Sequence, residues 1–321
     1  MVANRLKEEW LAVVLILVLA LGLPAGIFLW GQRSSAAGQE IQAAMPEKGG
    51  WAPDTLHMQA GEPLTLRLTS DDVVHGFAVG KQDLPAVDVL PGEVTEITLT
   101  FDEPGKYVYY CTRWCGPDHW RMRGTIIVEG AQQDGEPSPP LYTVMGFDLD
   151  AERTTEAIPD HTPSIQAGRQ VMNGIEVKHL APYRDEVYLK THSPARVWEA
   201  LRAEPFTAGL SDGQIWDLVA ALWRTGTSTE DIAKGQQLYA QNCAACHGTE
   251  GTGEGVFANQ LPSRDESDGE EHLSDTVAPA DFTDAEQMLA TNDAILQGKI
   301  IRGGMGTGMP YFGPIFTEEQ T

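Results

Sequence analysis

Residues 111–122 hold four side chains that bind soft metals. Cys111 and Cys115 lie on one short loop, with His119 four residues later and Met122 three residues after that. Thiolate, imidazole and thioether ligands select copper, zinc or iron–sulfur clusters over hard cations, and a Met beside Cys and His is typical of electron-transfer copper sites. A mononuclear blue site uses one Cys, whereas two Cys on one loop can bridge two copper ions. The loop therefore predicts an electron-transfer site held by a rigid fold.

Strand-like segments surround this loop. Residues 64–69 alternate apolar and polar side chains, as a half-buried strand does, and they lead to His75, our candidate for a second imidazole ligand. The loop itself joins two more strand-like stretches, residues 106–110 and 124–128. Short strands separated by turn signals are typical of Greek-key β-sandwiches. We expect His75 and the loop to meet at one end of such a sandwich.

Two other interpretations of the loop are open. One is a disulfide between Cys111 and Cys115, and the other is a structural zinc site made of these two residues with His119 and His75. Neither interpretation uses Met122. The softness of the whole ligand set therefore favours copper over both.

Residues 50–130 resemble the copper domain of subunit II of heme-copper terminal oxidases, which carries the binuclear copper centre CuA. The resemblance runs through residues 75–77, 89–93, 103–106, 111–122 and 124–128. It implies that the copper ligands are His75, Cys111, Cys115, His119, Met122 and the main-chain carbonyl of Arg113. The family often has a different side chain at the position of Arg113, but only the carbonyl is used there.

A second cofactor motif lies near the end of the chain. Cys243, Cys246 and His247 follow a helix-like stretch over residues 232–240 and form the attachment signature of c-type heme. In this motif two thiols add across the heme vinyl groups and the adjacent His takes one axial position. A thioredoxin-like dithiol is the alternative, but it leaves His247 unused and no strand–helix–strand pattern surrounds the pair. The motif predicts heme c, and no cysteine remains for a separate disulfide framework.

Residues 230–321 resemble class I cytochromes c, through the heme motif, the Gly-rich segment after it, residues 281–283 and a Gly-Thr-Gly-Met-Pro loop. The axial Met of that family precedes Pro, which implies Met309. Met305 is the alternative, and we interpret Met288 as packing. The resemblance also leads us to expect a mainly helical domain that is truncated at its C-terminal helix, unless a helix over residues 214–223 replaces it.

Residues 142–226 contain no cysteine and cannot attach heme covalently. Residues 210–223 have a helix cap and helical apolar spacing, and their start parallels that of residues 316–321. We interpret the segment as a degenerate cytochrome c-like helical unit used for packing. Its three histidines are candidates for binding a loose heme or copper, or for a proton path, although lone histidines are more often structural: His161, His179 and His192.

The first 31 residues are predicted to be a membrane anchor. Residues 10–30 contain no charged side chain, and about twenty such residues cross the ~30 Å hydrocarbon core as a helix. A cleaved signal peptide is the alternative. Linkers are predicted over residues 32–49 and 131–141. The net charge of −24 excludes a general nucleic-acid role and favours basic partners.

Together, the two resemblances imply an accessory subunit of cytochrome c oxidase in a prokaryotic cell membrane, with its redox domains on the periplasmic or extracellular side. A soluble cytochrome c or another small redox donor would reduce heme c, and the electron would pass through CuA to heme-copper oxidase subunit I, where oxygen is reduced to water. We expect no catalytic residue on this chain. The alternatives are the copper subunit of a nitric oxide reductase and a free-standing membrane-anchored electron carrier.

Overall fold

The structure is a computed structural model that describes residues 38–82, 84–116, 118–131, 138–260, 278–304 and 307–321. The chain divides into two compact units, Met1–Asp134 and Gly135–Thr321. The predicted N-terminal transmembrane helix lies outside the described residues. Within the described part, none of the helices is both long enough and apolar enough to cross a membrane.

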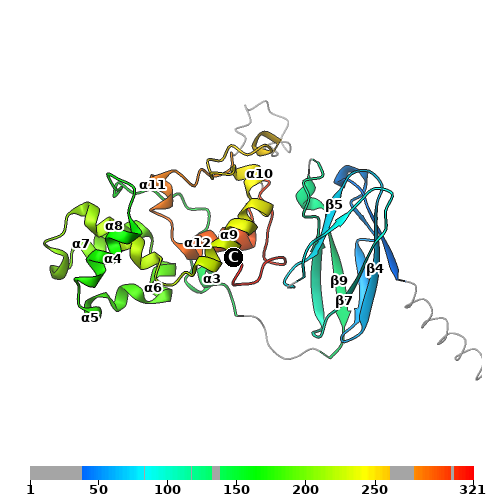
Figure 1. Cartoon of the computed structure of the whole chain (residues 1–321), viewed down its shortest axis with the longest axis horizontal. Coiled ribbons are helices and arrows are strands. Elements are labelled where there is room, and N and C mark those ends of the chain that lie inside the picture. The colour runs from blue at the N-terminus through cyan, green and yellow to red at the C-terminus, as the bar shows by residue number, and fades with distance from the viewer. Residues whose placement is uncertain (1–37, 83, 117, 132–137, 261–277, 305–306) are drawn as a thin grey trace, which may run out of the picture. The chain divides into compact units, whose positions relative to one another are not determined.

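The first unit is a sandwich of two β-sheets (Figure 1). One sheet has the strand order β2-β1-β4-β7 and the other has the order β3-β9-β8-β5-β6. The strands are β1 (Gln39–Ala43), β2 (Trp51–Ala52), β3 (Thr55–Gln59), β4 (Pro63–Ser70), β5 (His75–Val79), β6 (Val87–Val89), β7 (Thr95–Thr100), β8 (Gly105–Tyr110) and β9 (Arg123–Glu129). The sandwich predicted for the copper domain is confirmed.

The core of the sandwich lies between the sheets because each strand turns its apolar side chains to one face. Leu66 and Leu68 in β4 are fully buried, as the alternation in this segment predicts. On the other sheet, Tyr109 and Phe77 stack with ring centroids 5.3 Å apart. Full burial of one such side chain stabilises a fold by roughly 1.5–3 kcal/mol. The strands that hold the copper loop therefore rest on a packed core.

The first sheet corrects the linker predicted over residues 32–49. β1 pairs in parallel with β4, from Gln39 opposite Leu66 to Ala43 opposite Ser70. Ile41 and Ala43 are fully buried. A five-residue strand between small and polar residues gives a weak local signal, because its partner strand lies more than twenty residues away along the chain.

The second unit is mainly helical in its described residues, as predicted. Its α-helices are α3 (Leu141–Val144), α4 (Ile165–Asn173), α5 (Val177–Leu180), α6 (Glu186–Thr191), α7 (Pro194–Arg202), α8 (Asp212–Trp223), α9 (Thr229–Asn242), α10 (Ala244–His247), α11 (Ala285–Met288) and α12 (Asp293–Arg302). α3 packs against α12, so residues on both sides of the heme motif contribute to one unit.

The segment over residues 142–226 has a core of its own, filled by side chains of α4 to α8. α4 crosses α8 closely at Gly168, where an added Cβ atom would lie 1.8 Å from the carbonyl oxygen of Asp217. Ser211 and Gln214 form a capping box at the start of α8, which fits the cap predicted from the sequence. α8 packs against α4 and α7, and its Trp223 indole donates to Asp293 in α12 at 3.3 Å, so its use as a replacement helix for the last domain stays a prediction.

Unlike α4, α9 contains no buried residue. It begins with a capping box of Ser228 and Asp231, and among the described residues an added Cβ atom at Gly235 would meet no atom of another element within 4 Å. Near the end of the chain, the Thr317 amide donates to Gln320 Oε1 at 2.9 Å, and the Ser211 amide donates to Gln214 Oε1 at the same distance. The predicted parallel between these two segments therefore holds for this local contact.

Candidate copper and heme centres

Three strand ends bring the predicted copper ligands together. His75 is the first residue of β5, Cys111 directly follows β8, and Met122 directly precedes β9. β8 lies between β5 and β9 and pairs with both. The cysteine loop and His75 therefore meet at one end of this sheet, as the strand pattern predicted.

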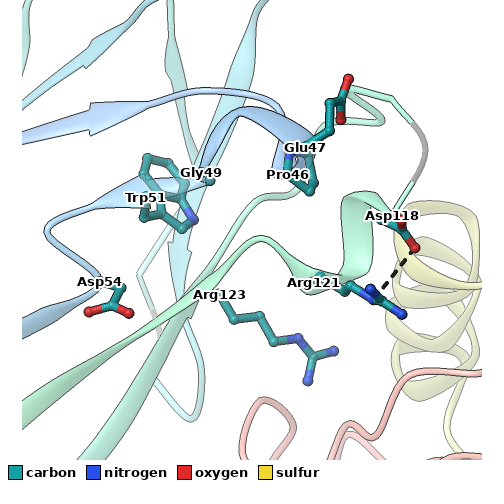
Figure 2. A pocket seen from close by; sticks show the side chains of 9 residues that line it. Pro46, Glu47, Gly49, Trp51, Asp54, Asp118, Arg121 and Arg123 are labelled. Atoms are coloured by element: carbon teal, nitrogen blue, oxygen red, sulfur yellow. Dashed lines mark ion pairs between the residues drawn. The ribbon is translucent and has the colours of Figure 1, made fainter.

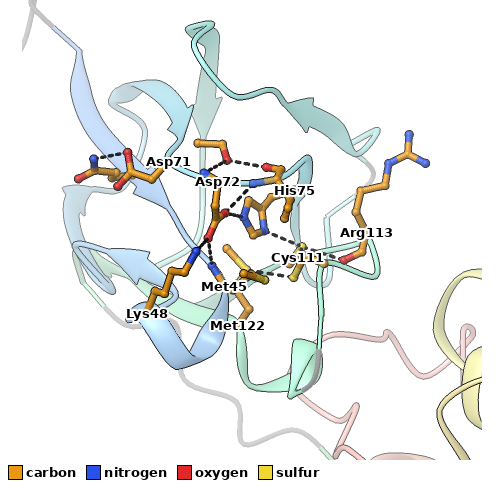
Figure 3. Close-up of polar contacts among 12 residues, drawn as sticks. Met45, Lys48, Asp71, Asp72, His75, Cys111, Arg113 and Met122 are labelled. Carbon is orange, nitrogen blue, oxygen red and sulfur yellow. Dashed lines mark hydrogen bonds and ion pairs between the residues drawn. The ribbon is translucent and has the colours of Figure 1, made fainter.

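The ligand atoms converge in a buried cluster, part of which is drawn in Figure 3. The sulfur atoms of Cys111 and Cys115 are 3.9 Å apart. His75 Nδ1 lies 3.8 Å from the sulfur of Cys111, and His119 Nδ1 lies 3.6 Å from that of Cys115. The Met122 sulfur lies 3.8 Å from the Cys115 sulfur. Each cysteine thus has one histidine beside it, and all five side chains are at most 8 % exposed.

The main-chain carbonyl of Arg113 completes the predicted set. Its oxygen lies 3.2 Å from the Cys111 sulfur. Among the described residues, the candidate metal cluster comprises His75, Cys111 and Cys115, whose ligand atoms all lie within 4.8 Å of one another. Both cysteines are free, and their sulfur separation is about twice the ~2.0 Å of a disulfide bond. The geometry fits the copper interpretation, and the individual ligand roles stay predictions.

The charge state of the two thiols also suits a metal. A hydrogen bond from Cys115, together with those from His119, His75 and the amide of Gly76, holds the pKa of Cys111 far below its ordinary value, although burial opposes this. The pKa of Cys115 is raised by its contact with Cys111 and by burial. Cys111 is therefore a thiolate beside the thiol of Cys115, and a metal bound to both sulfur atoms would compensate the buried charge and release the Cys115 proton.

Asp72 orients His75 and was missed by the sequence reasoning. Its Oδ1 lies 2.9 Å from His75 Nε2, and its Oδ2 accepts from the Met45 amide at 2.9 Å (Figure 3). Burial raises the pKa of Asp72, but hydrogen bonds from Met45, His75 and Val73 hold it well below its ordinary value. Burial likewise opposes protonation of His75, yet its contacts with Cys111 and Asp72 raise its pKa. A carboxylate on one ring nitrogen leaves the other available to a metal.

Aromatic side chains enclose this cluster. The Trp51 indole donates to the carbonyl of Met122 at 3.2 Å, and its ring meets Phe77 edge-on with centroids 5.6 Å apart. The Trp114 ring packs on His119 with centroids 4.6 Å apart. Packed, rigid surroundings of this kind keep ligands in place when the charge of a metal changes.

A polar pocket of about 320 Å³ lies beside the ligand loop (Figure 2). Arg121 and Asp118, which flank His119 in the sequence, lie 3.5 Å apart in an ion pair. The pocket is lined by Pro46, Glu47, Gly49, Gly50, Trp51, Asp54, Asp118, Arg121 and Arg123. Charged side chains that line this pocket are therefore close in the sequence to two predicted ligands, His119 and Met122.

The heme motif lies at the end of α9. Cys243 caps this helix, and α10 carries Cys246 and His247. Burial raises the pKa of Cys243 to about 11 and also raises that of Cys246, so both thiols are protonated at neutral pH. Burial lowers the pKa of His247, and its Nδ1 lies 3.1 Å from the carbonyl oxygen of Ala280. A neutral imidazole held at Nδ1 leaves Nε2 available to iron.

Met309 lies in a tight loop after α12. The Gly304 amide donates to its carbonyl at 3.2 Å. Gly303 has a φ of +75°, and an added Cβ atom there would lie 2.8 Å from the Met309 carbonyl oxygen, so the loop requires glycine at this position. Met305 lies outside the described residues, and Met288 is half-buried at the end of α11. The role of Met309 as the sixth iron ligand stays a prediction.

The three histidines of residues 142–226 have separate structural contacts. His161 lies between Asp160 and Asp217, at 2.8 Å and 3.2 Å. The ring of His179 stacks on Phe206, and that of His192 stacks on Tyr188. Because each ring packs against or hydrogen-bonds to its own neighbouring side chains, these contacts favour structural roles for the three histidines.

Two known protein families match this chain, one in its N-terminal part and one in its C-terminal part. Residues 15–128 match the cupredoxin-like domain family, and residues 232–321 match the cytochrome c family. Cytochrome c oxidase subunit 2 of Thermus thermophilus is 40% identical over 80 residues, which are 25% of this chain and 58% of that protein. Cytochrome c oxidase subunit 2 of Alkalihalophilus pseudofirmus is 25% identical over 188 residues, 52% of this chain and 50% of that protein.

Part of the chain is similar to other proteins as well. Nitrous-oxide reductase of Ralstonia nicotianae is 38% identical over 76 residues, 22% of this chain and 12% of that protein. Among solved structures, a heme-copper terminal oxidase dimer is 23% identical with a TM-score of 0.26, covering 39% of this chain and all of the matched chain. The chain spans 58% and 47% of the two Thermus relatives.

The chain thus combines a cupredoxin-like domain with a C-terminal cytochrome c domain, and its relatives include cytochrome c oxidase subunit 2. A cytochrome c domain implies heme c, and the copper domain of oxidase subunit 2 implies copper. Both predicted cofactors agree with the donor sets present, the Cys243–Cys246–His247 motif and the His75–Cys111–Cys115 cluster.

Proposed function

We propose that this chain is the electron-entry subunit of a heme-copper terminal oxidase. In this proposal an external donor reduces heme c, the electron passes to the CuA centre, and the oxygen-reducing site lies on heme-copper oxidase subunit I. The observation that supports it most is the convergence of two thiols, two imidazoles, a thioether and a carbonyl in one buried cluster.

The arrangement of the chain's own residues suits electron transfer better than catalysis. Bound copper and heme supply one-electron redox chemistry. Cys111 and Cys115 would hold the copper ions, Asp72 orients His75, and the Trp51 indole fixes the Met122 main chain through a hydrogen bond. The five ligand side chains are at most 8 % exposed, which supports a buried electron-transfer centre.

The location and partners belong to the same proposal. Residues 10–30 anchor the chain in a prokaryotic cell membrane, and the redox domains face the periplasmic or extracellular side. The net charge of −24 supports a basic donor, such as a soluble cytochrome c, because opposite charges speed the encounter of redox partners. Subunit I is the partner that receives the electron.

Metal analysis and electron paramagnetic resonance of the purified full chain test the cofactors. We expect two copper ions and one heme iron per chain, with one unpaired electron shared by both copper ions. One zinc ion and no copper would overturn the assignment.

Isolation from the native membrane tests the partner. We expect the chain to co-purify with a heme-bearing membrane subunit that consumes oxygen when reduced cytochrome c is added. Consumption of nitric oxide without consumption of oxygen would instead identify the copper subunit of a nitric oxide reductase. A lone chain that passes electrons between soluble proteins would identify a free-standing carrier.

A further inference from the structure

An ion pair ties the cysteine loop to the strands that carry His75. The Nε and Nη2 atoms of Arg113 each lie 2.8 Å from a carboxylate oxygen of Asp88, which is in β6. Asp88 is the register partner of Gly76 in β5, so the ion pair ends one residue from His75. Two parallel N–H···O bonds fix the guanidinium in direction as well as in distance.

Gly76 has no side chain and therefore allows the cysteine loop to pack directly against β5. The Thr112 amide donates to the Gly76 carbonyl at 3.2 Å, and the Gly76 amide donates to the Cys111 sulfur at 3.4 Å. An added Cβ atom at Gly76 would lie 2.1 Å from Thr112 Oγ1 and 3.2 Å from Arg113 Cγ. With no side chain between them, Arg113 reaches across Gly76 to Asp88.

The two ends of Arg113 have different tasks. Its carbonyl points to Cys111, whereas its side chain extends away from the ligand cluster (Figure 3). Asp88 is held from its other side, because Thr95 Oγ1 donates to its carbonyl at 3.0 Å. Anchoring the side chain therefore restricts rotation of the peptide whose oxygen faces the copper site.

We propose that Asp88 and Arg113 form a clasp that positions the Arg113 carbonyl toward copper and sets the spacing between His75 and the cysteine loop. The proposal rests on the copper centre proposed above, and both side chains are positioning residues. They are 46% and 57% exposed, and exposed ion pairs add little to global stability. The clasp therefore acts on the copper site and not on folding.

The test compares Asp88→Asn, Arg113→Gln and the double variant in the full chain loaded with copper and heme. We expect each single variant to release copper to a chelator about tenfold faster than the wild type, as is usual for partners that orient metal ligands. The copper hyperfine splitting should change in the same variants. The double variant should match the single ones, because either change removes the same pair.

Two controls separate the clasp from general effects of charge. Arg67→Gln removes an exposed ion pair with Glu40 in the other sheet and should leave copper release unchanged. Arg113→Lys keeps the charge but loses the paired hydrogen bonds, and should give an intermediate rate. The thermal unfolding midpoint of the apo sandwich should be the same in all these variants.

Two results overturn the clasp while leaving the copper centre intact: wild-type copper release and spectra in both single variants, or fully additive effects in the double variant. If the wild-type chain binds no copper, the proposed function and the clasp fail together.

Discussion

The copper site and the heme site differ in how deeply the protein buries the residues that would bind each cofactor. His75 and Met122 are 0 % and 1 % exposed and sit on the packed core of a sandwich. The heme motif follows α9, which buries none of its residues, and Cys243 and Cys246 are only half-buried. The comparison teaches that the protein's own strands bury the predicted copper ligands, whereas its own helices leave the heme-attachment cysteines partly exposed.

The same contrast appears between two helices with one sequence pattern. α4 and α9 both read Ile-x-x-Gly-x-Gln, with the glycines at Gly168 and Gly235. α8 covers Gly168 closely, whereas beyond its own helix backbone no atom of the described residues lies within 4 Å of a Cβ atom built at Gly235. Over residues 142–226, buried side chains of α4 to α8 form the core that covers Gly168.

The largest effect is expected from removing the heme attachment. In Cys243→Ser/Cys246→Ser, α9 to α12 should lose most of their protection from hydrogen exchange, because heme no longer supplies packing. The copper signal should persist in the same sample. Hydrogen exchange read by mass spectrometry checks both halves of the chain. Unchanged protection in α9 would show that this region packs without its cofactor.

A single ligand change should abolish the copper signal without unfolding the sandwich. In His75→Ala the shared-valence resonance should disappear, while the heme absorption spectrum stays that of the wild type. His57→Ala is the matched control, because the His57 side chain is 61% exposed and its Nδ1 lies 3.7 Å from Glu129, outside the ligand cluster. Loss of the resonance in both variants would contradict the assignment of His75.

The two helix glycines should respond to alanine with opposite signs. Gly168→Ala is expected to destabilise the segment by about 1–3 kcal/mol, because the new methyl group would meet the Asp217 carbonyl at 1.8 Å. Gly235→Ala should instead stabilise α9 by up to about 1 kcal/mol through helix propensity. Urea unfolding followed by circular dichroism measures both. Equal effects would show that the two helices have similar surroundings.

The smallest effect is expected from the titration of His161. Its contacts with Asp160 and Asp217 raise its pKa above the ordinary 6.5. The stabilisation is therefore complete below pH 6.5 and is lost as the pH rises through the folded-state pKa. Nuclear magnetic resonance should show the raised pKa, and His161→Gln should remove this component of the pH dependence of unfolding. A pKa at or below 6.5 would contradict the contacts. The titration belongs to the heme-free segment, so the copper signal should not follow it.

Individual residues show which parts of the candidate sites can be predicted from the sequence. The loop ligands from Cys111 to Met122 and the Cys243 to His247 motif follow from local spacing, which survives without knowledge of the fold. His75 required the additional step of expecting a strand. Asp72 lies only three residues before His75, and the pair Asp71-Asp72 is a local signal of a carboxylate near this ligand.

Other features could not be found because they depend on pairing between distant strands. The local pattern over residues 32–49 predicts a linker and not β1, because the partner strand β4 is distant in sequence. Asp88 is 25 residues from Arg113, and no spacing rule connects them. Their proximity arises only when β5 pairs with β6 and the loop crosses Gly76.

The sequence by itself determined the chemistry of this protein, because side-chain softness and short spacings decide which cofactors can bind. The tertiary structure alone decided the geometry: which carboxylate faces His75, which anchors Arg113, and which of two similar helices is covered. Ligand type is a property of single residues, whereas orientation and burial are properties of contacts between segments that meet only in the folded chain.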